Sequence, residues 1–165
     1  MISITLPDGS IRKFKISPSG SQIAAQIGEG LAKAAIAMRV NGKLVDLSST
    51  VDKDSNVSIL TKKDEESLEL IRHDVAHILA ESVQELFPGT QVTIGPNIEN
   101  GFYYDFARKE PFTLDDLKQI EVKMAEIIDR DQPFEKEIWD RDYAIRIFEE
   151  KGEKYKAELI KDLPE

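Results

Sequence analysis

The sequence predicts an α+β protein built from two parts, and three observations support that prediction. The first 62 residues contain short runs of alternating apolar and polar side chains, separated by turn residues. The remainder contains two long stretches whose apolar residues recur at helical spacing. The charge also changes along the chain. Residues 1–62 contain eight Lys/Arg and five Asp/Glu, a balance of +3. Because the whole chain has a net charge of −9, residues 63–165 carry −12. We place the boundary at Lys62–Ser67, which is charged and lacks large apolar side chains.

The first part is predicted to be a small β-grasp domain, the ubiquitin-like fold, over residues 1–62. Residues 2–6 and 11–16 alternate around the turn "PDGS" and predict a β-hairpin. A short helix follows in "QIAAQIGEGLAKAA", with Gly28 ending its first part. Three further short strands are predicted in "IAMRV", "LVDL" and "NVSILT". One helix can cover one face of a mixed sheet in this β-β-α-β-β-β order.

The second part, residues 63–165, is predicted to mix helices with a few strands. A long periodic helix runs from Glu65 to Phe87, where Pro88 and Gly89 stop it. Two antiparallel strands are expected in "QVTIG" and "GFYYDF". A second long helix begins after Thr113, which can cap it with Asp116 at the reciprocal position. The remaining expected elements are a strand in "PFEKEIW", a helix in "RDYAIRIFEEKG" and a last helix in "YKAELIKDLPE".

Composition excludes several classes of protein. The 41% hydrophobic content can supply a core, and no apolar run reaches the roughly 18 residues of a membrane helix. The opening "MISITLPDGS" lacks the layout of a signal peptide, so we expect a cytoplasmic location. The absence of cysteine excludes disulfides, thiolate metal sites and a cysteine nucleophile within this chain. A net charge of −9 argues against a generic phosphate-binding surface.

The only two histidines, His73 and His77, stand four residues apart in the first long predicted helix. At about 100° per residue, their rings leave the helix within about 40° of each other. The main apolar stripe faces roughly away from them, and it consists of Leu68, Ile71, Val75, Ile78, Leu79, Val83 and Leu86. Satisfied core histidines, solvent-exposed histidines and an accidental spacing all remain open on this geometry.

Two imidazoles on one helix face are suited to moving protons near neutral pH, because an ordinary histidine titrates there. One ring could deprotonate a water while the other donates to a leaving group, which would be hydrolysis or another acyl transfer. A metalloprotease is excluded, because Asp74 stands where the motif HExxH requires Glu and no third ligand is evident. The pair could hold a divalent cation only with ligands from outside the chain, so no metal site is predicted from this chain alone.

A family resemblance is carried by five stretches spread over the whole chain. They are "ITLPDGS", "GLAKAAIAMRVNGKLVDL", "IRHDVAHIL", "IGPNIENGFYYDF" and "GEKYKAELI". In this order they resemble the N-terminal part of the bacterial threonyl-tRNA synthetase family. Residues 1–62 resemble its TGS domain, a β-grasp module, and residues 63–165 resemble the first part of its editing domain.

The resemblance implies a proofreading role, the hydrolysis of serine mischarged onto tRNA(Thr). Serine lacks only a methyl of threonine, which is worth about 1 to 3 kcal/mol in a binding site, so a second and tighter pocket is needed. The resemblance assigns catalytic roles to His73 and His77, the family's HxxxH pair, and to Lys156 in "KYKAEL". It assigns substrate binding to Tyr104 in "GFYYD". On the residues alone, Lys156 would be a solvated helix lysine and Tyr104 a strand tyrosine packed on Phe102 or Phe106.

The chain departs from the family pattern in one respect: the Cys-x-x-x-His pair that completes the editing site is absent. We therefore expect a truncated editing domain, inactive in aminoacylation and weak or inactive in editing by itself. The family's ATP, magnesium and zinc belong to its catalytic core, so no cofactor is expected here. The expected partner is tRNA(Thr), and a homodimer is expected through that core. The alternative is a TGS-type binding or adaptor module without catalytic activity.

Overall fold

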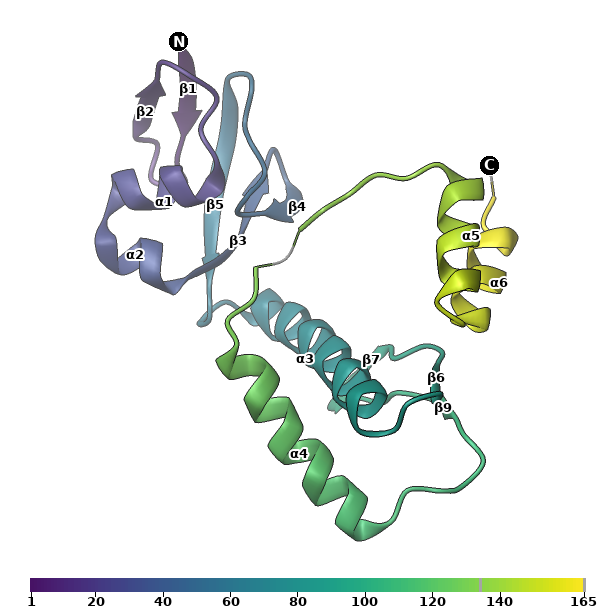
Figure 1. Ribbon diagram of the computed structural model, residues 1–165. Coiled ribbons are helices and arrows are strands. Elements are labelled where there is room, and N and C mark those ends of the chain that lie inside the picture. The colour runs from purple at the N-terminus through teal and green to yellow at the C-terminus, as the bar shows by residue number, and fades with distance from the viewer. Residues whose placement is uncertain (134, 165) are drawn as a thin grey trace. The chain divides into compact units, whose positions relative to one another are not determined.

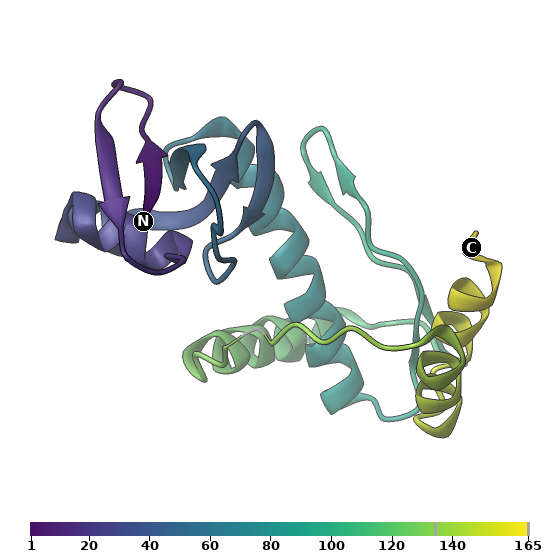
Figure 2. The ribbon, with the colours of Figure 1, turned by 90° about the horizontal axis from the view of Figure 1, so that it is seen from above.

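The computed structural model describes residues 1–133 and 135–164, which fall into two compact units. The first unit is Met1–Leu70 and the second is Ile71–Glu165, so the division lies within one long helix. Figures 1 and 2 show the elements of both units.

The first unit is a five-stranded mixed sheet with two helices. Figure 1 shows these helices, α1 and α2, next to the sheet. The strand order is β2-β1-β5-β3-β4, in which β1 and β5 run parallel and the other neighbours run antiparallel. The β-grasp prediction is confirmed, with a second short helix directly after the predicted one. The elements are β1 Ile2–Thr5, β2 Ile11–Phe14, α1 Gly20–Ile27, α2 Glu29–Ala34, β3 Ala35–Val40, β4 Lys43–Asp46 and β5 Ser55–Thr61.

Local signals in the sequence explain where these elements begin and end. Ser19 caps α1 through a reciprocal pair of contacts with Gln22, which satisfies backbone N–H groups at the start of the helix. The N–H of Gly28 donates to the carbonyl of Ala24 at 3.0 Å and closes α1. Beneath the helix, Ile4, Ile23 and Met38 are fully buried and form the centre of the core. Alternation along the strands therefore supplies one apolar face, as predicted.

The second unit contains helices around an interrupted hairpin. The paired strands are very short, but hydrogen bonds between residues 93–94 and Asp105 continue the pairing between them. The predicted antiparallel pair is thus confirmed as two extended arms, seen in Figure 2. The elements of this unit, with the helix that leads into it, are α3 Glu65–Leu86, β6 Gln91–Val92, β7 Asn97–Ile98, β8 Gly101–Phe102, β9 Phe106–Ala107, α4 Leu114–Asp129, α5 Arg141–Glu150 and α6 Lys154–Asp162.

One predicted element is wrong: the described residues of "PFEKEIW" form no strand, and Phe134 lies outside the described residues. Ile138 is 90% exposed, so the alternating pattern of this segment does not cover any core. A strand needs a partner to satisfy its backbone, and among the described residues of this segment no strand pairing occurs. The predicted helices on either side are confirmed as α4 and α5.

The predicted apolar stripe of α3 is confirmed in part. Val83 is fully buried and four other members of the stripe are half-buried, whereas Leu68 and Ile71 are exposed. The buried surface also includes Ala76 and Ala80, which lie between the stripe and the histidines around the helix.

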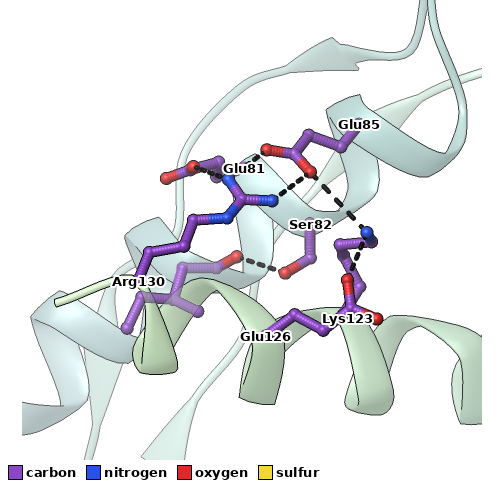
Figure 3. A network of polar contacts seen from close by, with 7 residues as sticks. Glu81, Ser82, Glu85, Lys123, Glu126 and Arg130 are labelled. Carbon is purple, nitrogen blue, oxygen red and sulfur yellow. Dashed lines mark hydrogen bonds and ion pairs between the residues drawn. The ribbon is translucent and has the colours of Figure 1, made fainter. Parts of the chain in front are cut away.

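A cluster of ion pairs joins α3 to α4, as Figure 3 shows. The guanidinium of Arg130 donates to both carboxylate oxygens of Glu85, at 2.6 and 2.7 Å, and to Glu81 at 3.3 Å. Lys123 lies 3.9 Å from the same Glu85 carboxylate. The hydrogen bond from Arg130 holds the pKa of Glu85 below its usual range. This bidentate contact links the C-terminal half of α3, the helix that carries the histidines, to the end of α4.

We predict that Ile4→Ala will destabilise the first unit by about 2–5 kcal/mol, because a fully buried isoleucine leaves a cavity when it is truncated. The matched control is Ile11→Ala on the neighbouring strand, where the side chain is 57% exposed and the expected change is about 0.5 kcal/mol or less. Urea unfolding followed through NMR signals of the sheet residues measures both. Equal losses in the two variants would contradict the assigned core.

Candidate functional site

The two histidines form a contacting pair on α3. Their Nε2 atoms lie 3.0 Å apart, and their rings meet edge to face with centroids 4.6 Å apart and planes at 82°. One ring donates and the other accepts in this contact, according to their tautomers. Both side chains are exposed, so a water or ligand can reach them. The two histidines therefore share one face of the helix, as predicted, and their rings are in direct contact.

Gln84 extends the same face of α3 and connects it to α6. It stands seven residues after His77, about two helical turns, and so within about 20° of the same direction. Its amide Nε2 donates to Oε1 of Glu153, the residue directly before α6. On α6, Lys156 places its Nζ 3.7 Å from the other oxygen of Glu153. The histidine face and the candidate lysine are thus joined through Glu153.

The start of α6 is held by further contacts. The backbone N–H of Lys154 donates to Oε1 of Gln91 in β6, at 3.2 Å. Gly152, at φ +75°, turns the chain between α5 and α6, and such a conformation favours glycine. Ala157 is buried where α6 packs. These contacts fix the first turn of α6, which carries Lys156.

Tyr104 lies on the hairpin and is half-buried. Its ring stacks on Phe106 with centroids 4.9 Å apart, and it also covers the backbone of Gly95. Burial, and then the negative charge of Glu153, raise the pKa of Tyr104, so its hydroxyl stays protonated at neutral pH and can donate a hydrogen bond. Glu153 therefore interacts with Tyr104 as well as with Lys156.

The electrostatic surroundings of His77 favour its neutral form. Partial desolvation lowers the pKa of His77, and the neighbouring His73 lowers it further. Asp74 acts in the opposite direction, while the positive charge of Lys156 adds to the lowering. A neutral imidazole has one nitrogen lone pair that can accept a proton, so His77 is a candidate for a base.

Lys156 and Tyr104 both interact with Glu153, and the charge of Lys156 also acts on His77, which contacts His73. A hollow of ≈ 410 Å³ between the hairpin and α6 is lined by Lys156, but its lining contains neither histidine. Within residues 1–133 and 135–164, no cluster of three or more His, Cys, Asp or Glu is placed to hold a metal ion. The arrangement supplies proton donors and acceptors together with one cation.

Two residues of this neighbourhood were not singled out from the sequence as site residues, Glu153 and Gln84. An acid three residues before a lysine is common on exposed helices, so Glu153 gave no distinguishing signal. Gln84 had a signal, because its helical position coincides with that of the histidines. Its partner lies 69 residues away, however, and only the fold shows that contact.

We predict that His77 titrates below the ordinary histidine value, and that His73→Ala raises its pKa because one opposing charge is removed. With only two imidazoles in the chain, NMR signals of the ring protons can be followed individually. Because folding lowers this pKa, the unfolded chain binds the proton more readily, so His77 should reduce stability as the pH falls below about 6.5. A His77 pKa above the ordinary value would contradict the described environment.

We also predict that Gly95→Ala displaces the ring of Tyr104. A Cβ at this position would lie 2.6 Å from Tyr104 Cε2, closer than real Cβ atoms approach a ring. Gly30→Ala is the control, because a Cβ there meets nothing within 4 Å. Ring-proton chemical shifts of Tyr104 and Phe106, which report the stacking, should change in the first variant and not in the second. Unchanged shifts in Gly95→Ala would show that the ring does not cover this glycine.

No helix in the described part of the chain is both long and apolar enough to cross a membrane. Comparison with known proteins assigns the first unit: residues 2–61 match the TGS domain. The whole chain is also similar to curated bacterial proteins named threonine–tRNA ligase. It is 64% identical to the one from Granulibacter bethesdensis, over 100% of this chain and 26% of that protein. The corresponding protein of Acidiphilium cryptum is 63% identical, over 99% of this chain and 26% of its own length.

A third relative, from Maricaulis maris, is 61% identical over 100% of this chain and again 26% of its own length. The chain thus spans about a quarter of the length of the relatives it matches. It carries a TGS domain and matches, over its whole length, the N-terminal part of bacterial threonine–tRNA ligases.

Proposed function

We propose that this chain contributes to a proofreading site that hydrolyses the ester between serine and tRNA(Thr). The observation that carries the proposal is the contact between the Nε2 atoms of His73 and His77, 3.0 Å apart on an exposed helix face near Lys156. The relatives are named for attaching threonine to tRNA, which supports an aminoacyl-tRNA as the ligand. In this proposal His73, His77 and Lys156 are catalytic, and Tyr104 contacts the substrate.

The proposed reaction needs only water as co-reactant and no cofactor. His77 takes a proton from a water, whose oxygen attacks the ester carbonyl carbon and forms a tetrahedral intermediate. The ammonium of Lys156 stabilises the developing oxyanion. The bond to the ribose oxygen then breaks, and His73 donates a proton to that leaving oxygen. The products are free serine and tRNA with its terminal hydroxyl restored.

A lowered His77 pKa supports this division of roles. At neutral pH His77 is mostly neutral and can accept a proton, which a general base requires. The protonated hydroxyl of Tyr104 can donate to the substrate, and its ring, packed on Phe106, offers a rigid wall. A rigid wall is what a pocket needs in order to exclude the additional methyl of threonine.

The acidic second part limits how this chain alone would bind RNA. A balance of −12 over residues 63–165 repels a phosphate backbone, so most of the tRNA affinity has to come from elsewhere in the assembly. We therefore propose tRNA(Thr) as the substrate of the site and expect weak activity from the isolated chain. A homodimer remains a prediction from the resemblance, and a cytoplasmic location remains a prediction from the composition and the N-terminal sequence.

We predict that His73→Ala and Lys156→Ala each reduce hydrolysis of seryl-tRNA(Thr) by on the order of 100-fold. The test uses a chimera in which this chain replaces the matching N-terminal quarter of the Granulibacter bethesdensis ligase, alongside the isolated chain. Threonyl-tRNA(Thr) serves as the substrate that the site should spare. Lys154→Ala is the matched lysine control, because its side chain is exposed and only its backbone N–H makes the contact with Gln91.

Threonine attachment by the chimera verifies that the replacement folds. If that chimera charges tRNA but releases serine no faster than the uncatalysed rate, the proposed hydrolysis is wrong and the adaptor alternative is favoured. If it hydrolyses the ester and His73→Ala has no effect, the hydrolysis stands but the histidine assignment fails.

A further inference from the structure

Glu153 carries a negative charge in a largely buried position, which the proposed reaction does not use. Its side chain is 13% exposed, and its Oε2 is buried without a hydrogen-bond partner among the described residues. The nearest cation is the Nζ of Lys156, at 3.7 Å. A buried carboxylate is costly unless it is paired, so this ammonium is held near Glu153 by charge.

Glu153 is itself held in place from α3. Its Oε1 accepts the hydrogen bond from Gln84, which lies on the histidine face of that helix. The backbone N–H of Lys154 donates to the side-chain Oε1 of Gln91 in β6, which ties down the neighbouring chain. The carboxylate therefore has one oxygen committed to α3 and the other available to Lys156, one helical turn further along α6.

We propose that Glu153 is a positioning residue, which holds the ammonium of Lys156 beside the His73 and His77 pair. Gln84 orients the carboxylate, the carboxylate orients the lysine, and the lysine supplies a fixed positive charge at the site. The inference deepens the proposed function and rests on it for its chemical purpose. The placement of the lysine, however, can be tested without any reaction.

The charge of Glu153 gives this placement a signature with a definite sign. As a simple neighbouring anion, Glu153 would stabilise the imidazolium, so its removal would lower the pKa of His77. If Glu153 is a positioning residue, its removal lets the ammonium of Lys156 move away from His77. The loss of that positive charge then raises the pKa of His77. The other charged neighbours of His77 are His73 and Asp74, which lie on α3 and are unchanged in the variants.

We predict that Glu153→Gln raises the pKa of His77, measured by NMR titration of the two imidazoles in the full 165-residue chain. Lys156→Met should raise it as well. In the Lys156→Met background, Glu153→Gln should produce no further rise, because the lysine charge is already absent. Glu153→Asp, which keeps the charge, should restore part of the wild-type value. The matched control is Glu158→Gln, an exposed carboxylate on the same helix, which should leave the titration unchanged.

A lower or unchanged His77 pKa in Glu153→Gln, together with a raised one in Lys156→Met, would overturn the proposal. The proposal would also be overturned if Glu153→Gln raised the His77 pKa equally in the wild-type and Lys156→Met backgrounds. The effect would then not depend on the lysine. If Glu153→Gln does not fold, as judged by its amide spectrum, Gln84→Met decides the matter. That variant leaves the carboxylate charged but removes its tie to α3, and it should shift His77 in the same direction.

A second measurement separates this inference from the proposed function. In the ligase chimera, Glu153→Gln should reduce seryl-tRNA(Thr) hydrolysis about tenfold or more, because a displaced catalytic group is ineffective. If the His77 pKa responds to Glu153→Gln and Lys156→Met as predicted but the chimera does not hydrolyse the ester, the positioning is supported and the reaction is rejected. If hydrolysis depends on His73 but not on Glu153, and the His77 pKa does not rise in Glu153→Gln, only the positioning is rejected.

Discussion

The candidate site depends on one face of α3, because the helical repeat places His73, His77 and Gln84 in a single row. The first two positions bring the imidazoles into contact, and the third binds the residue that precedes α6. The two imidazoles and the Gln84 contact to the start of α6 thus lie on the same face of α3. The ion pairs between Arg130 and Glu85 hold α3 against α4 independently of that row. The contact between these two helices therefore does not use the reactive groups.

Much of the fold could be predicted because its signals are local. The capping contacts of Thr113 with Asp116 involve neighbours in the sequence, and both reciprocal hydrogen bonds are present. The alternation around Ile4 fixed which strand face would be buried. By contrast, "PFEKEIW" has a pattern that a strand could have, but strand formation requires a partner that no local pattern supplies. The burial of Ala76 and Ala80 was not predicted for a related reason, because the small apolar surface of alanine gives little local signal and its burial depends on the tertiary fold.

The same division holds for the site. The shared face of the histidines followed from their spacing, whereas the 3.0 Å contact between them required side-chain conformations. The neighbourhood of Lys156 and Tyr104 was expected only through the family resemblance, since the two residues lie on different elements. Glu153, whose charge reaches both, depends on a contact across 69 residues and had no signature in the sequence. Which residues lie together was therefore partly predictable, and the charge that connects them was not.

The contact between the two imidazoles means that a proton can pass directly from one ring to the other. At 3.0 Å, the two Nε2 atoms can share a proton in an N–H···N hydrogen bond. A proton taken up by one histidine can therefore be given up by the other without crossing solvent. Such a transfer leaves the total charge of the helix face constant.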